Sequence, residues 1–245
     1  MQKLILKKKK KSEEKSEQSQ KKELSTEQKV ALQAVQKQLQ LLKLREWLVL
    51  AGFVFGGAAL RVPMQAIPSA EPITFFAILA GWLFGKKKGF ITGAAAGYMS
   101  NFFMFGGQGP WSIFQVFAWG AAGFLGGFIR NIKPSKNYFL FWIRSIIPLM
   151  IITVLSTLIF DISLNIGWSF FMPFGILTLI LSGLPFLLIH LVSNIGFSLL
   201  LPFARKFTYE KGKFNEMELC KAVIDRINSK FKPNRVLPAG KPTEQ

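Results

Sequence analysis

Hydrophobic residues form six long runs in the middle of the chain, separated by short polar breaks. The runs lie at residues 47–60, 73–84, 90–105, 111–129, 139–160 and 174–203. A helix that crosses the hydrocarbon core of a bilayer, ~30 Å thick, needs about 20 apolar residues, or fewer where its ends tilt or dip. The pattern therefore predicts an all-α membrane protein, a bundle of six transmembrane helices. The second and third runs are short, so an alternative arrangement makes one of them re-entrant.

The polar segments on either side of this middle carry helical patterns of their own. Ser25 and Gln28 have the spacing of a capping box, and apolar residues recur every three or four positions over 32–42. This amphipathic helix either lies against the membrane surface or a partner helix, or extends the first run inward. A second amphipathic helix is predicted over 215–229, where apolar residues share one face.

Charge divides the chain in the same way. Residues 1–45 hold 13 Lys and Arg against 5 acids and 204–245 hold 10 against 5, whereas 46–203 hold only 8 against 3. We therefore expect a basic cytoplasmic extension over 1–45, disordered and then helical, a membrane domain over 46–203 and a basic cytoplasmic tail with a short helix over 204–245. Basic margins beside membrane spans indicate contact with anionic lipid and not with nucleic acid.

The basic residues between the runs predict the orientation. If the N-terminus is inside, Lys86–Lys88, the basic residues of 130–136 and the Arg205–Lys206 pair all fall on the cytoplasmic side. The opposite loops then hold one arginine and two acids. Every loop agrees with the positive-inside rule, so we expect a multi-pass protein of the cell membrane with both termini in the cytoplasm.

The residue patterns of catalysis are missing. His190 and Cys220 are the only histidine and cysteine, so the chain forms no internal disulfide and no cysteine metal cluster. The segment from Gly81 to Lys86 is one residue too short for a phosphate-binding loop, and no Ser-His-Asp set or HExxH motif is present. We therefore expect that the protein is not an enzyme and has no catalytic residues, metal or cofactor.

Polar side chains that remain in or beside the hydrophobic runs gather toward the predicted outer face. Buried polar groups in a membrane cost free energy unless they are paired, so such a group indicates a wet, ligand-binding cavity. The alternative is hydrogen bonding between helices, with an ion pair of Arg61 to Glu71 or to Asp161. The residues in question are Arg61, Glu71, Asn101, Gln115, Trp119, Asp161, Asn165 and Trp168.

Two further features bear on ligand binding. The segment 102–111 is rich in Phe and Gly and contains Gln108 and Trp111. Since aromatic walls give a pocket its contact area and a few polar groups orient the ligand, this segment is predicted to fold over a flat molecule. His190 and Asn194 lie four residues apart on the sixth run and share a face, either as hydrogen-bonded packing residues or as contacts for a ligand or a proton.

Small residues recur at helical spacing in three of the runs. The third run holds Gly89, Gly93 and Gly97, and four glycines lie over 120–127 in the fourth. Helices associate in lipid through close backbone approach, which small residues permit, so these glycines are predicted to pack the bundle. Gly52 and Gly56 on the first run have the same spacing and either pack the bundle or face another subunit.

Together these features resemble the S component, the substrate-binding subunit, of energy-coupling factor (ECF) vitamin transporters. The resemblance covers about residues 47–203. Its most specific part is Arg61, Pro63, Ile67, Pro68 and Pro72, followed by the glycines at 89, 93 and 97, Asn101, and the segment 106–111 that leads into Gln115 and Trp119.

The resemblance implies a protein that captures a vitamin or cofactor precursor at the outer face and docks on a membrane scaffold subunit driven by two ATP-binding subunits. Gly52 and Gly56 match the positions where small residues of the family, typically alanines, contact the scaffold. The long basic N-terminal extension is a departure from the family. The substrate site of the family maps onto Arg61, Asn101, Gln108, Trp111, Gln115, Trp119, Asp161, Asn165 and Trp168.

Two other functions fit the same pattern. One is a membrane scaffold protein that recruits cytoplasmic partners or lipid through its basic termini, and the other is a stand-alone secondary transporter. The aromatic segment suits flavin-, pterin-, corrin- and deazapurine-like molecules equally, so the sequence does not select a substrate.

Overall fold

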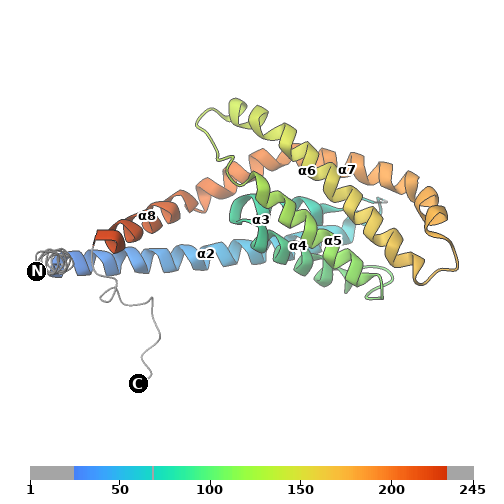
Figure 1. Ribbon diagram of the computed structural model, residues 1–245, viewed down its shortest axis with the longest axis horizontal. Coiled ribbons are helices and arrows are strands. Elements are labelled where there is room, and N and C mark those ends of the chain that lie inside the picture. Colours follow the sequence, from blue (N-terminus) through green and yellow to red (C-terminus); the bar gives the residue numbers. More distant parts are fainter. Residues whose placement is uncertain (1–24, 68, 231–245) are drawn as a thin grey trace, which may run out of the picture. The chain divides into compact units, whose positions relative to one another are not determined.

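The computed structural model describes residues 25–67 and 69–230, and this part of the chain contains helices and no strands (Figure 1). Two compact units divide the chain: Met1–Arg45 with Lys213–Gln245 form one, and Glu46–Gly212 form the other. The described helices are α2 (Thr26–Met64), α3 (Pro72–Phe84), α4 (Lys86–Asn101), α5 (Ser112–Gly126), the 3-10 helix η1 (Gly127–Ile129), α6 (Tyr138–Ser169), α7 (Ile176–Lys211) and α8 (Phe214–Lys230).

Four of the described helices are long and apolar enough to cross a membrane: α2, α5 together with η1, α6 and α7. The apolar helix α3 is shorter, at 13 residues, and α4 has 16. At 1.5 Å per residue these two helices are about 20 and 24 Å long, less than the ~30 Å of hydrocarbon. The prediction of an all-α fold is confirmed for the described residues, and four of the helices have the length and composition of membrane-spanning helices.

The first unit contains the start of α2 and the whole of α8. Ser25 caps α2 as predicted, because the Gln28 N–H donates to Ser25 Oγ (3.2 Å) while the Ser25 N–H donates to Gln28 Oε1 (3.0 Å). The helix then continues without a break to Met64, so the amphipathic segment does extend the first hydrophobic run. The second predicted amphipathic helix is confirmed as α8, in which Phe214 and Met217 are buried while Leu219 and Val223 of the predicted apolar face are exposed.

Within the second unit, glycines set the packing of α3, α4 and α5. A Cβ on Gly89 would overlap the carbonyl oxygen of Gly123, a Cβ on Gly123 would overlap that of Gly89, and one on Gly93 would overlap the carbonyl oxygen of Trp119. The α4 and α5 backbones are therefore in direct contact, as the glycine spacing predicted. Gly81 brings α3 equally close to Gly123. Helices α6 and α7 pack along each other and against this group (Figure 1).

One predicted boundary is wrong in a way that matters for the site. The fifth run was expected to end at Phe160 and to leave Asp161, Asn165 and Trp168 in a loop, but α6 continues to Ser169. These three residues are spaced four and three apart, so on a helix they share one face. The apolar residues between them, such as Ile162, keep the other side hydrophobic. The segment is thus an amphipathic end of the helix.

A buried arginine joins several helices at the end of the second unit that lies opposite to Asp161, Asn165 and Trp168. Arg205 of α7 is 2 % exposed, and its guanidinium donates to the carbonyl oxygens of Trp82 (2.9 Å), Arg130 (3.2 Å) and Ile132 (3.2 Å). Carbonyls at the C-terminal end of a helix have no partner within it. Arg205 satisfies such groups at the ends of α3 and η1 and so attaches α7 to both.

The glycine contacts predict a position-specific effect of one methyl group. We expect Gly93→Ala to lower the free energy of unfolding by about 1–3 kcal/mol, because its Cβ has no room beside Trp119 and the backbones must separate. Gly196→Ala on α7 is the matched control, since a Cβ there meets nothing within 4 Å and gains helix propensity. Reversible unfolding in mixed detergent micelles measures both, and equal stability of the two variants would contradict the packing described.

Candidate functional site

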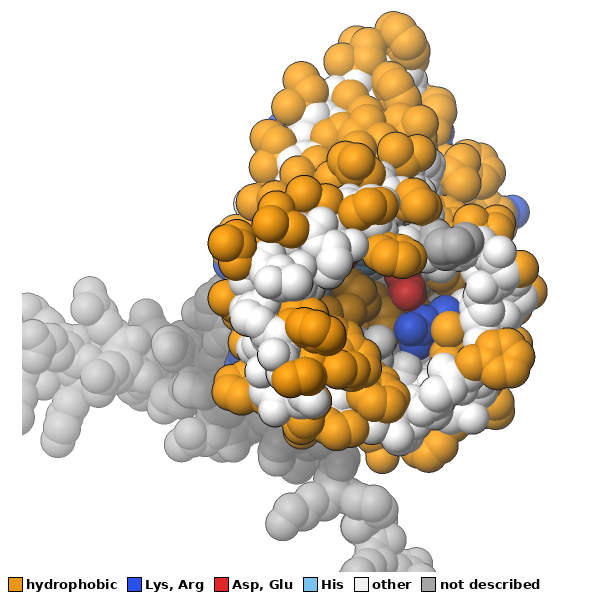
Figure 2. Space-filling view, turned by 90° about the vertical axis from the view of Figure 1, so that its right-hand side faces the viewer, with side chains coloured by type: hydrophobic (Ala, Val, Ile, Leu, Met, Phe, Trp, Pro, Cys, Tyr) orange, Lys and Arg blue, Asp and Glu red, His pale blue; other side chains and the backbone are white. Residues whose placement is uncertain are grey.

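A cavity of about 600 Å³ opens at the end of the second unit, where α6 and α7 meet α5 and the start of α3. Figure 2 shows this face as a hollow with acidic and basic side chains on its floor and hydrophobic side chains around it. The size is typical of small-molecule sites. Its polar lining consists of Ser69, Glu71, Gln115, Asp161, Asn165, Ser182 and His190. The remaining lining consists of Phe160, Leu164, Trp168, Met172, Phe174, Leu179, Gly183 and Phe186.

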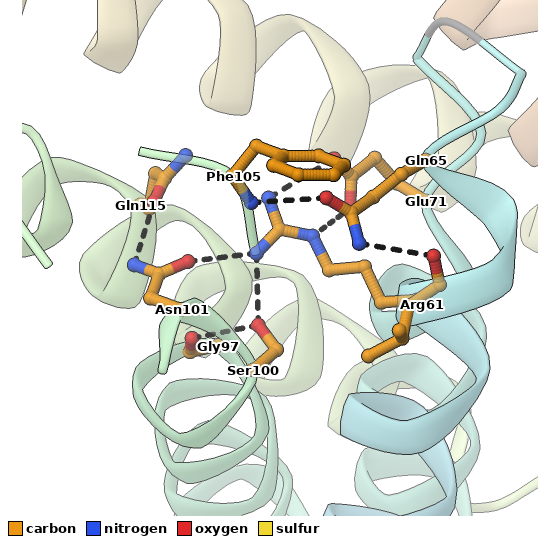
Figure 3. A network of polar contacts seen from close by, with 9 residues as sticks. Arg61, Gln65, Glu71, Gly97, Ser100, Asn101, Phe105 and Gln115 are labelled. Carbon is orange, nitrogen blue, oxygen red and sulfur yellow. Dashed lines mark hydrogen bonds and ion pairs between the residues drawn. The ribbon is translucent and has the colours of Figure 1, made fainter. Parts of the chain in front are cut away.

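Arg61, near the end of α2, lies beneath this cavity and is 6 % exposed. Its Nη1 donates to Ser100 Oγ (2.8 Å) and to Asn101 Oδ1 (2.7 Å) at the end of α4. Its Nε lies 3.1 Å from Glu71 Oε2, which forms the ion pair considered from the sequence (Figure 3). The guanidinium also lies over the Trp119 ring, 4.6 Å from the centroid. One side chain therefore joins α2 to α3, α4 and α5.

Asn101 connects Arg61 to Gln115 in the cavity wall. Because its Oδ1 accepts from Arg61, its Nδ2 is the group that faces α5, where it donates to Gln115 Oε1 (2.9 Å) and to Ser112 Oγ (3.2 Å). Gln115 thus has its oxygen engaged, and its amide nitrogen is left to face away from Asn101 (Figure 3). The buried Arg61 therefore sets the orientation of the Gln115 amide through Asn101, which bonds to both.

The second polar group of the cavity joins α6 to α7. His190 Nδ1 lies 2.9 Å from Asp161 Oδ2, and His190 is 2 % exposed. The other ring nitrogen, Nε2, has no hydrogen-bond partner among the described residues. Asn165, one turn beyond Asp161, donates its Nδ2 to the Asp161 carbonyl oxygen (2.9 Å). Asp161 therefore pairs with His190, and the alternative pairing with Arg61 is not formed.

Aromatic rings separate the two polar groups. Trp119 is fully buried and packs on Phe160, with ring centroids 4.9 Å apart, and Phe160 meets the His190 ring edge-on at 5.1 Å. Phe160 lines the cavity, while Trp119 lies behind it. A ligand in the cavity would thus contact an aromatic floor that the buried Trp119 supports.

The structure distributes the nine predicted site residues over three places. Four of them line the cavity: Gln115, Asp161, Asn165 and Trp168. Arg61, Asn101 and Trp119 lie in the network behind the wall. The remaining two come from segment 102–111 and do not line the cavity. Gln108 donates to the Tyr98 carbonyl oxygen (2.7 Å), and the Trp111 ring stacks on that of Trp168, with centroids 5.2 Å apart.

The sequence reasoning missed most of the wall that α7 contributes. Leu179, Ser182, Phe186 and His190 follow one another at three- and four-residue steps and all line the cavity. That spacing is typical of one helical face. However, most of these residues are apolar and lie within a long hydrophobic run, so hydropathy does not distinguish this face from the others. Only His190 was singled out, together with Asn194, which instead donates to Thr157 Oγ1 (2.9 Å) on α6 and serves packing.

The two glycines predicted to dock on a scaffold subunit, Gly52 and Gly56, differ in the space around them. A Cβ on Gly52 would meet nothing within 4 Å, so this glycine is not required for packing within the unit. A Cβ on Gly56 would lie 3.6 Å from the Phe76 ring, an ordinary van der Waals contact. The surface around Gly52 is apolar, with Leu48 and Phe55 exposed.

Comparison with known proteins returns no match to a protein-family model, a characterised protein or a solved structure. The chemistry of the site therefore rests on its own geometry. Among the described residues no group of three His, Cys, Asp or Glu side chains is arranged to hold a metal ion. The cavity offers hydrogen-bonding groups on one side and aromatic and aliphatic surface on the other, which is the composition of a site that binds a small molecule.

The Arg61 network predicts an asymmetric response to mutation. Arg61→Met should lower the free energy of unfolding by about 3 kcal/mol, because it leaves the largely buried Glu71 carboxylate, 13 % exposed, without its partner. The double variant Arg61→Met, Glu71→Met removes both charges and should recover a large part of this loss. Unfolding in mixed micelles measures the three proteins side by side. A double variant no more stable than Arg61→Met would contradict the role given to the ion pair.

Proposed function

We propose that the protein is the substrate-binding subunit of an ECF-type importer, which captures a vitamin or cofactor precursor in the cavity. The observation that carries the proposal is the cavity itself, which lies at one end of the helices and has polar and aromatic walls. The resemblance of residues 47–203 to S components supports the same function.

The proposal includes six spans with both termini in the cytoplasm. Helix α6 begins beside the basic end of the unit, where Lys206 Nζ lies 5.5 Å from the Tyr138 ring, and it ends with Asp161 and Trp168 at the cavity. The basic residues and the cavity thus occupy opposite ends of the same helices. Under the positive-inside rule the basic end faces the cytoplasm, and the cavity then opens to the outside, where a nutrient is captured.

Docking on a scaffold subunit driven by two ATP-binding subunits completes the proposed cycle. The exposed apolar surface around Gly52 supports this part, because it leaves a close approach open to another helix and is not used within the unit. Small residues are what helix contacts in a membrane require. Substrate binding and docking would then use separate surfaces of the protein.

The proposed function predicts that a small molecule is bound to the purified protein. Mass spectrometry of protein purified in mild detergent should detect a small molecule that is depleted in Gln115→Ala, because loss of one hydrogen-bonding group weakens binding by about fivefold. Gln65→Ala is the matched control: its Oε1 accepts from the Phe105 N–H, and it does not line the cavity. If no molecule co-purifies, or if both variants retain it equally, the cavity is not the substrate site.

The second prediction separates capture from transport. Gly52→Leu should leave retention of that molecule unchanged and abolish its uptake by cells, because the side chain obstructs the docking surface without a clash inside the unit. Gly196→Leu on α7 is the control, since its Cβ also points into open space. Wild-type uptake by Gly52→Leu would contradict docking at this surface.

A further inference from the structure

The cavity leaves one buried nitrogen for a ligand to satisfy. His190 is 2 % exposed and lines the cavity, its Nδ1 is engaged by Asp161 at 2.9 Å, and its Nε2 has no partner in the described part of the chain. A buried polar atom without a partner is costly, so the bound state should supply one. When Nδ1 carries the single proton of the ring, Nε2 is a hydrogen-bond acceptor.

The neighbouring groups add acceptors to the same region. Asn165 uses its Nδ2 for the Asp161 carbonyl oxygen, so its Oδ1 is the remaining group of that side chain. Asp161 pairs with His190 through Oδ2, which leaves Oδ1 of a carboxylate that is 20 % exposed. The amide nitrogen of Gln115 is the donor that the Arg61 network leaves on the opposite wall. The α6–α7 side of the cavity is therefore rich in acceptors.

The formal charges of the cavity lining also favour a ligand that donates hydrogen bonds or carries positive charge. Two carboxylates line the cavity, those of Glu71 and Asp161, and the basic group beneath its floor is the Arg61 guanidinium, which is already paired with Glu71. Arg61 offsets the charge of Glu71 from behind, whereas in the described part of the chain the Asp161 carboxylate pairs with His190. With a neutral imidazole the Asp161 charge is uncancelled, and with a protonated one the pair is neutral. In neither state does the lining carry an excess of positive charge for an anionic ligand.

We infer that the cavity takes a small molecule with a flat aromatic body and a protonated or N–H-bearing nitrogen, and that Asp161 with His190 and Asn165 binds that nitrogen. The inference rests on the proposed function only in that the cavity takes up a small molecule. Phe160, Trp168 and Phe186 supply the apolar contacts for the flat body. Ligands whose recognition depends on a carboxylate or phosphate are disfavoured, because the Arg61 guanidinium beneath the floor is already engaged by Glu71, Ser100 and Asn101.

Three bicyclic probes of matched size test the inference: 4-aminoquinoline, which is cationic near neutral pH, quinoline, which is neutral, and quinoline-4-carboxylate. The full-length protein in lipid nanodiscs is titrated with each, and quenching of tryptophan fluorescence is confirmed by equilibrium dialysis. The cation should bind about tenfold more tightly than the neutral probe, the factor expected for one favourable charged hydrogen bond, and the carboxylate more weakly than both.

Two variants move the preference in opposite directions. Asp161→Asn should reduce the ratio of cation affinity to quinoline affinity, measured in the same variant, from about ten to about one, whereas Asn165→Asp should raise this ratio by adding a second carboxylate. Asp225→Asn, the same exchange at an exposed position of α8, is the control and should bind like the wild type. Because Asn165→Asp is a gain of selectivity, misfolding cannot imitate it.

The outcomes separate the inference from the proposed function. If quinoline or its carboxylate binds the wild type as tightly as the cation, the ligand class is wrong, while a cavity that binds small molecules still stands. Loss of all selectivity in Asp225→Asn would overturn the assignment to Asp161. If none of the three probes binds, the inference fails as well, and the molecule that co-purifies with the protein then decides the proposed function by itself.

Discussion

The contacts of the Arg61 guanidinium hold the cavity end of the second unit together. A buried cation in apolar surroundings is tolerated only when acceptors surround it, and here they come from Glu71 before α3 and from Ser100 and Asn101 at the end of α4. The ring of Trp119 completes the environment from α5. Because each acceptor has one position that satisfies Arg61, the ends of α2, α3, α4 and α5 are fixed relative to one another.

Close packing makes this network possible. Gly89 and Gly93 on α4 and Gly123 on α5 bring two backbones into contact, and only then do the polar side chains at the ends of these helices come within hydrogen-bond distance. At the opposite end Arg205 donates to three carbonyl oxygens and attaches α7 to α3 and η1. A buried arginine thus closes each end of the unit, with backbone-to-backbone contact between them.

Helices α6 and α7 supply the opposite wall of the cavity. Their own polar contacts, Asp161 with His190 and Asn194 with Thr157, join the two helices to each other more than to the rest of the unit. The cavity therefore lies between two groups of helices. Arg61 joins the ends of α2, α3, α4 and α5, and the contacts of Asp161 with His190 and of Asn194 with Thr157 join α6 to α7. This arrangement suits a proposed capture subunit, because preorganised polar groups orient a ligand and reduce the free-energy cost of binding it.

The sequence by itself determined the helical class, the capping of α2 by Ser25, the helix α8 and the close packing of Gly89 and Gly93, because hydropathy runs, caps and glycine spacing act within a few residues of the chain. It also marked Gln115, Asp161 and Asn165, since polar residues stand out in an apolar run. Only the tertiary structure decided that Arg61 pairs with Glu71 while Asp161 pairs with His190. Those partners depend on how far each helix extends and how it is rotated about its axis, and the packing of distant segments sets both.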